Sequence, residues 1–220
     1  MTAPRIALVH AMPIAIDPVA HVFHELWPQA RITHLLDDAL APDLSAAGSI
    51  TPAMVERFVA LARYCESCGA NAILFTCSAF GAAIEAAKGS VRVPVLKPNE
   101  AMLEEALAAG SDLALLTTFE PSIPSLKKEF EELASSRGIR LKLKTRTVPA
   151  AIAALQQGRA SEHDSLIAAA AAEMGPCDAL VLGQFSMARA AAGIPPAPGR
   201  KVVTSPHSAV TRLKRIFDVR

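Results

Sequence analysis

The chain has 220 residues, 51% of them hydrophobic, with 22 lysines and arginines against 21 aspartates and glutamates. This length allows one large core or two smaller ones of about 100 residues each. A net charge of +1 without a basic cluster gives no support for nucleic-acid binding. No run reaches the ~18 apolar residues of a membrane helix, and no basic flank with an apolar core precedes the strand pattern that starts at Arg5. We therefore expect a cytoplasmic protein that binds neither nucleic acid nor a membrane.

Short apolar runs alternate with helical patterns along the chain, which is typical of parallel sheets covered on both faces. We predict strands near 5–10, 31–36, 72–76 and 93–96, and then near 112–117, 140–147, 179–183 and 201–204. Helices fill the gaps. Thr51 and Pro52 are a typical N-cap and first-turn pair, and Gly69 and Gly110 are typical helix stops. Pro94 indicates that the fourth strand is short or lies at an edge.

Three segments recur at a nearly constant spacing. Residues 72–79 (AILFTCSA) are similar to 179–186 (ALVLGQFS), 107 residues later, which places Gln184 at the position of Cys77. The same offset relates 6–11 to 113–118, and an offset of 108 relates 95–99 to 203–207. We infer two pseudo-symmetric α/β halves near 1–97 and 98–206, each a flavodoxin-like four-stranded parallel sheet with helices on both faces. A cleft between them would have Cys77 on one wall and Gln184 on the other.

Ligands of open parallel sheets bind beyond the carboxyl ends of the strands, where helices begin. This rule selects His10, Thr76, Cys77, Ser78, Thr117, Thr118, Gln184, Phe185 and Ser186. Cys77 precedes a helix predicted from Ala79, whose N-terminus would lower the pKa of the thiol. The hydroxyls of Ser78, Ser186, Thr117 and Thr118 can donate to a carboxylate, or equally cap a helix. The predicted site suits a small anion.

The sequence gives no sign of a metal or an organic cofactor. Cys65, Cys68, Cys77 and Cys177 are expected to be reduced, because a cytosolic chain of this length does not need a disulfide framework. Cys65 and Cys68 form a C-x-x-C pattern without a second cysteine pair to complete a zinc site. No G-x-G-x-x-G follows the first strand, so we expect no nucleotide site.

At its cysteine segment the chain resembles the aspartate/glutamate/hydantoin racemase superfamily. Residues 75–79 (FTCSA) are similar to the first cysteine motif of that family, and residues 181–187 (VLGQFSM) to the second, in which Gln184 replaces the cysteine. The resemblance implies two pseudo-symmetric halves, with 207–220 returning to the first. It also implies a cofactor-independent enzyme that acts at the carbon next to the carboxylate of a small organic or amino acid.

The replacement by Gln184 changes what the resemblance implies about mechanism. Two-cysteine racemases remove a proton with one thiolate and return one to the opposite face with the other thiol, but glutamine transfers no proton near neutral pH. Cys77 would then act from one side. It could protonate a carbanion, as in the arylmalonate decarboxylase branch, whose single cysteine lies in the other half. It could instead attack as a nucleophile, as in the maleate isomerase branch, with Gln184 donating to an oxyanion.

Three functions follow from these residues. A racemase or isomerase is the first expectation, a decarboxylase or lyase is the main alternative, and a small-anion binding protein without catalysis is the third. A racemase needs a second proton source, for which His10 and His207 are candidates because each follows a strand; either could instead only hydrogen-bond a loop. The other histidines, including His34, are expected to be structural or exposed. A homo-oligomer is left open.

Overall fold

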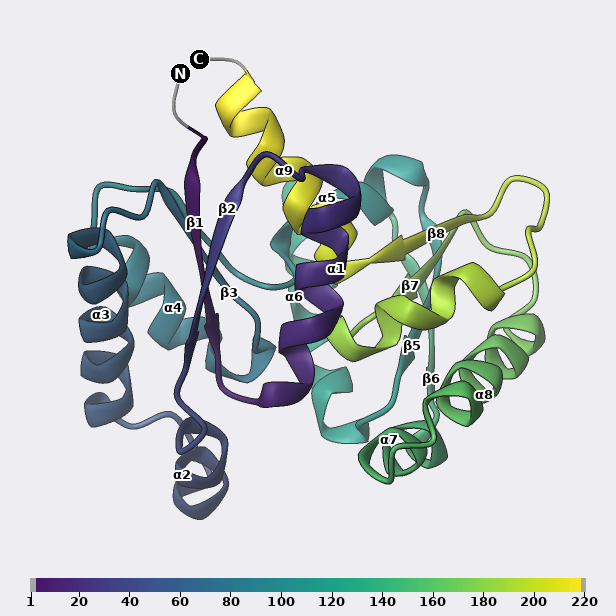
Figure 1. The fold of residues 1–220 in the computed structure, drawn as a ribbon. Helices are drawn as coiled ribbons and strands as arrows, with labels where there is room; N and C mark the ends of the chain where they lie inside the picture. Colours follow the sequence, from purple (N-terminus) through teal and green to yellow (C-terminus); the bar gives the residue numbers. More distant parts are fainter. Residues whose placement is uncertain (1–2, 219–220) are drawn as a thin grey trace. The chain divides into compact units, whose positions relative to one another are not determined.

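The computed structural model describes residues 3–218 of the chain. These residues form two compact units, of which the first contains residues 3–100 and 209–218 and the second contains Ala101–Ser208. Each unit holds one four-stranded parallel sheet (Figure 1). The predicted fold class, two similar α/β halves with four strands each, is confirmed. No helix in this range is long and apolar enough to span a membrane.

The first unit has the strand order β2-β1-β3-β4. Its strands are β1 (Arg5–His10), β2 (Arg31–Leu36), β3 (Ala72–Phe75) and β4 (Val95–Leu96). Its helices are α1 (Ile16–Leu26), α2 (Leu40–Ala47), α3 (Pro52–Ser67) and α4 (Gly81–Lys88), together with residues 209–218 of α9 (Ser205–Asp218). Strand β4 is short and lies at the edge, as the position of Pro94 predicts, because proline has no N–H to donate to a neighbouring strand.

Alternate residues of the central strands face different helices. Ala7, Val9 and Phe75 pack in one apolar cluster with Phe58 of α3 and Ile84 of α4. Figure 1 shows α3 and α4 on this side of the sheet and α1 on the other. Because both faces are covered, the central strands are continuous apolar runs in the sequence.

Helix α3 begins and ends as predicted. The hydroxyl oxygen of Thr51 accepts a hydrogen bond from the backbone N–H of Met54 at 3.3 Å, and Pro52 occupies the first turn. Gly69 follows the C-cap residue Cys68 with a φ of 79°. That left-handed conformation favours glycine, which explains the stop at this residue.

The C-terminal helix α9 completes the first unit with its later turns. The ring centroids of Trp27 and Phe217 lie 5.7 Å apart, and Lys214 Nζ donates to the backbone oxygen of Leu26 at 3.1 Å. The last described turns of α9 therefore pack against the C-terminal end of α1.

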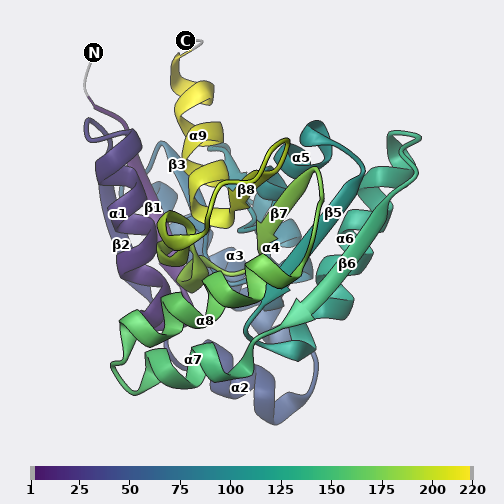
Figure 2. The same cartoon turned by 90° about the vertical axis from the view of Figure 1, so that its right-hand side faces the viewer.

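The second unit has the strand order β6-β5-β7-β8. Its strands are β5 (Asp112–Thr117), β6 (Lys142–Thr147), β7 (Ala179–Leu182) and β8 (Lys201–Thr204). Its helices are α5 (Glu100–Ala109), α6 (Ile123–Ser136), α7 (Pro149–Gln156) and α8 (Ala160–Glu173), and a long 3-10 segment, η4 (Phe185–Gly193), follows β7. Helices α5 and α6 pack on one face of the sheet, whereas α7, α8 and η4 pack on the other (Figure 2).

The repeat found in the sequence recurs in the strand register. Strand β1 pairs with β3 so that Ile6 lies opposite Ala72, and β5 pairs with β7 so that Leu113 lies opposite Ala179. Both residues of the second pair are 107 positions after those of the first. The two units therefore share a topology and a register.

The residues just before these strands repeat a backbone contact. The side-chain oxygen of Asn71 accepts from the N–H of Arg5 at 2.8 Å, and that of Asp178 accepts from the N–H of Asp112 at 2.9 Å. Gly110 leaves room for the second contact, since a Cβ there would lie 2.1 Å from Asp178 Oδ2. In each unit a polar side chain thus ties the starts of the two central strands together.

Candidate active site

Three polar side chains form a row across the carboxyl end of the first sheet. His10 ends β1; its Nδ1 lies 2.9 Å from Thr76 Oγ1, and its Nε2 lies 3.0 Å from Nδ1 of His34 in β2. Leu8, two residues before His10, is opposite His34 in the register, so both histidines project from the same face. The structure therefore joins two predicted site residues, His10 and Thr76, and adds His34, which we expected to be only structural or exposed.

His10 is a neutral imidazole at physiological pH. Its side chain is fully buried, and burial, with a smaller effect of His34, lowers its pKa from 6.5 to about 4. Burial also lowers the pKa of the more exposed His34, while Asp17 acts in the opposite direction. The buried ring therefore has one N–H and one bare nitrogen at neutral pH.

Cys77 lies two residues beyond the end of β3, half-buried against an apolar cluster. It lines a small hollow together with Val9, His10, Ala11, Leu40, Phe58 and Phe75. Burial raises the pKa of the Cys77 thiol, and a hydrogen bond from the backbone of Ala79 opposes this only in part. The expectation of a lowered pKa is therefore wrong, because the apolar surroundings outweigh the backbone contact.

The segment after Cys77 differs from the helix start that the sequence predicts. The α-helix expected from Ala79 begins only at Gly81, and Ser78–Phe80 form a short 3-10 turn instead. One 3-10 turn therefore lies between Cys77 and the first turn of α4. Ser78 is half-buried at the first position of this turn, beside the thiol in sequence.

In the second unit, Thr118 fixes the orientation of Gln184. The Gln184 side-chain oxygen accepts from the Thr118 backbone N–H at 2.6 Å and from the Thr118 hydroxyl at 2.7 Å. A backbone N–H can only donate, so the group that faces it must be the amide oxygen. The NH2 group of Gln184 points away from Thr118 and remains a donor.

Thr117 ends β5 with its side chain fully buried. Its hydroxyl lies 3.3 Å from the hydroxyl of Thr147 in the neighbouring strand β6. Thr117 therefore contacts the sheet, whereas Thr118 contacts Gln184.

Gly183, between β7 and Gln184, lies where a larger residue does not fit. A Cβ at this position would be 2.9 Å from Leu115 Cδ1, 3.2 Å from Leu126 Cδ1 and 3.3 Å from the backbone oxygen of Leu116. The glycine lets the chain leave the sheet close to β5 and bring Gln184 within reach of Thr118.

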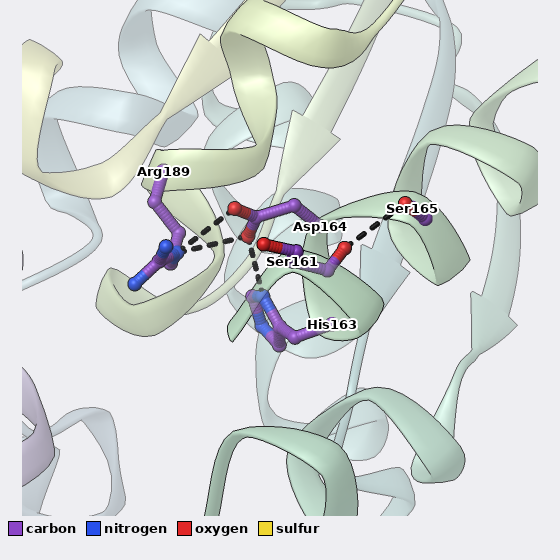
Figure 3. A network of polar contacts seen from close by, with 5 residues as sticks. All are labelled: Ser161, His163, Asp164, Ser165 and Arg189. Carbon is purple, nitrogen blue, oxygen red and sulfur yellow. Dashed lines mark hydrogen bonds and ion pairs between the residues drawn. The ribbon is translucent and has the colours of Figure 1, made fainter. Parts of the chain in front are cut away.

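The segment η4, which follows Gln184, is tied to helix α8 by charged side chains. Nε of Arg189 donates to both carboxylate oxygens of Asp164, at 2.9 and 3.0 Å, and His163 Nδ1 lies 2.7 Å from Asp164 Oδ1 (Figure 3). Phe185 and Ser186, both predicted site residues, are buried at the start of this segment. The Asp164 contacts hold in place the backbone that carries them.

His207 lies in the first turn of α9 and is half-buried. Its Nδ1 is 2.7 Å from the hydroxyl of Thr204, and its backbone N–H donates to the same oxygen at 3.4 Å. Thr204 thus caps the N-terminus of α9, and the His207 ring makes a hydrogen bond to this capping residue.

Sequence reasoning missed three residues that support the predicted ones, namely His34, Asp164 and Arg189. Their patterns resemble ordinary strand and helix surfaces, and only the fold brings them to their partners. Within residues 3–218, no group of three or more histidine, cysteine, aspartate or glutamate side chains is placed to hold a metal ion.

Comparison with known proteins connects this geometry to a family. The fold is similar to Picrophilus torridus aspartate racemase (TM-score 0.71, 14% identity, 97% of this chain and 94% of that chain). It is also similar to allantoin racemase from Klebsiella pneumoniae (TM-score 0.69, 18% identity, 99% and 89%) and to glutamate racemase from Thermus thermophilus (TM-score 0.65, 21% identity, 99% and 81%). No curated protein sequence matches the chain. The Asp/Glu/Hydantoin racemase model matches residues 18–213, and the chain belongs to this family.

Proposed function

We propose that the chain is a cofactor-independent enzyme that acts at the carbon next to the carboxylate of a small organic or amino acid, with racemase or isomerase chemistry. Its family membership supports an enzyme of this type. One observation extends the proposal to a particular residue: the half-buried Cys77 lies two residues beyond the carboxyl end of β3. Parallel α/β proteins bind their ligands at this end of the sheet.

The raised pKa of Cys77 supports a role as proton donor. A thiol with a pKa above its ordinary value keeps its proton at neutral pH and can give that proton to a carbanion. A nucleophilic role requires the thiolate, which would have to form after the substrate binds.

The fixed amide of Gln184 favours a second candidate, a decarboxylase or lyase on the same scaffold. The amide exchanges no proton near neutral pH, but its NH2 group can donate to an oxygen that gains negative charge in the reaction. With Cys77 as the single proton donor, a new C–H centre would be formed with one handedness.

The remaining residues of the strand ends complete the proposed site. We assign Ser78 and neighbouring backbone N–H groups to the substrate carboxylate, since a hydroxyl and an amide are both donors. The other proposed members are His10, Thr76, Thr117, Thr118, Phe185, Ser186 and His207. A cytoplasmic location belongs to the same proposal and is supported by four free cysteines.

A panel of small carboxylates in D2O tests the proposal. Deuterium at the α-carbon and release of carbon dioxide are measured together, with the wild type, Cys77→Ser and Cys68→Ser. Exchange without carbon dioxide identifies a racemase or isomerase, and carbon dioxide with one deuterium per product identifies a decarboxylase. Cys68 is an exposed cysteine of the same unit, so Cys68→Ser should keep the activity that Cys77→Ser loses. Binding of a carboxylate without either reaction would contradict the enzyme proposal.

A further inference from the structure

In the row His34–His10–Thr76 the direction of one hydrogen bond determines the direction of the other, and the proposed chemistry does not use this coupling. Each of its two contacts needs one donor and one acceptor, and each neutral ring supplies one of both. The row can therefore run in only two directions when both rings are neutral. Either every hydrogen points from His34 toward Thr76, or every hydrogen points the opposite way.

The backbone of Val9 favours the direction from His34 toward Thr76, which we call the inward direction. Thr76 Oγ1 also lies 3.3 Å from the carbonyl oxygen of Val9, which can only accept. If His10 Nδ1 donates to Thr76, the single hydroxyl hydrogen of Thr76 is available for Val9 and three hydrogen bonds form. If Thr76 donates to His10, that hydrogen is used and only two form. One net hydrogen bond favours the inward direction by a factor of about ten.

A second proton on His34, which makes the ring cationic, also favours the inward direction. The cationic form of His34 has hydrogens on both nitrogens, so it can only donate to His10 Nε2. The nearby carboxylate of Asp17, on α1, favours this charged form, whereas burial opposes it. Both protonation states of His34 are thus compatible with one arrangement of the buried ring.

We propose that His34 is a positioning residue that donates to His10 Nε2, holds His10 in the Nδ1–H tautomer and thereby directs the Thr76 hydroxyl hydrogen to Val9. Thr76 then has no hydrogen for a substrate carboxylate. Beside Cys77 it offers only a lone pair, which suits an N–H or O–H group of the substrate. The inference refines the proposed site, but its test reads the His10 ring directly and needs no substrate.

Two substitutions of nearly equal size test the direction of the row. In His34→Asn the amide replaces the Nδ1 position and can still donate, whereas in His34→Asp the carboxylate can only accept. The side-chain nitrogens of 15N-histidine-labelled full-length protein are observed by NMR, and the His10 signals are assigned by their loss in His10→Asn. Wild type and His34→Asn should show His10 protonated at Nδ1 with a bare Nε2. His34→Asp should show a proton on Nε2.

Controls separate this effect from a general disturbance. His24 is an exposed histidine of α1, and His24→Asn and His24→Asp should leave the His10 signals unchanged. Circular dichroism checks the fold of each variant. A wild-type His10 protonated at Nε2 alone would overturn the proposal, and this result is available even if His34→Asp does not fold. Identical His10 signals in His34→Asn and His34→Asp would overturn it as well.

Discussion

The side-chain oxygen of Gln184 accepts two hydrogen bonds from Thr118, one from its backbone N–H at 2.6 Å and one from its hydroxyl at 2.7 Å. These contacts leave the NH2 group of Gln184 as the free end of the side chain. The residue that the internal repeat places at the position of Cys77 is therefore a fixed hydrogen-bond donor. This distinction between a donor and a proton-transfer group can be tested by substitution.

Gln184→Glu keeps the two acceptor contacts with Thr118 but removes the N–H donor. If the donor stabilises an oxyanion, kcat should fall by about 10²–10³. Thr118→Ser, which keeps the hydroxyl and the backbone N–H, should remain close to wild type. The comparison uses kcat with the substrate identified in the carboxylate panel, and equal kcat values for Gln184→Glu and wild type would remove the oxyanion role.

Gln184→Cys gives both halves of the repeat a cysteine at the same position. The unmodified protein should be a poor racemase of ordinary amino acids, because one thiol returns a proton to one face only. The variant should create or raise racemisation, while losing the contact that the amide made. Chiral separation of products after incubation in D2O gives the result. Fast racemisation by the unmodified protein would redirect the search for a second base to His10 and His207.

His10 should make stability depend on pH in the acidic range. Its pKa is lowered from 6.5 to about 4 in the folded protein, so between these values the unfolded chain binds more protons. The contribution of His10 is complete above pH 6.5 and is lost as the pH falls toward 4, by up to about 3 kcal/mol. In His10→Asn, which has no group that titrates there, the free energy of unfolding should change less over this window. Urea denaturation at a series of pH values measures the difference, and parallel curves for the two proteins would show that the ring is not held neutral.

Gly183→Ala should destabilise the second unit by about 1–3 kcal/mol, because the new Cβ would crowd Leu115 and the backbone of Leu116. Gly193→Ala is the matched control, since a Cβ there has no atom within 4 Å and its φ is not positive. Thermal unfolding followed by circular dichroism compares the two. A Gly183→Ala protein as stable as Gly193→Ala would mean that the segment before Gln184 shifts without cost.

The sequence predicts the fold well because its signals are local or periodic. Apolar runs and an offset of 107 residues identify the strands and the two halves, and Pro94 correctly indicates a short edge strand. The direction of the shift in the Cys77 pKa was predicted wrongly, because it depends on burial against Leu40 and Phe58, which are distant in sequence. The facing Cys77 and Gln184 walls of a cleft stay a prediction. The His34 and Thr118 contacts depend on strand register, which no single segment encodes.

The most direct test of the account is the rate at which Cys77→Ser incorporates solvent deuterium next to the substrate carboxylate, compared with the wild type and Cys68→Ser. Serine is close in size to cysteine but is a far weaker acid, so its hydroxyl cannot replace the thiol as proton donor. We predict a fall of about 10²–10⁴ for Cys77→Ser, with an unchanged circular dichroism spectrum, and full activity for Cys68→Ser. Substantial exchange by a folded Cys77→Ser protein would contradict the account, because the chemistry would then not depend on this thiol.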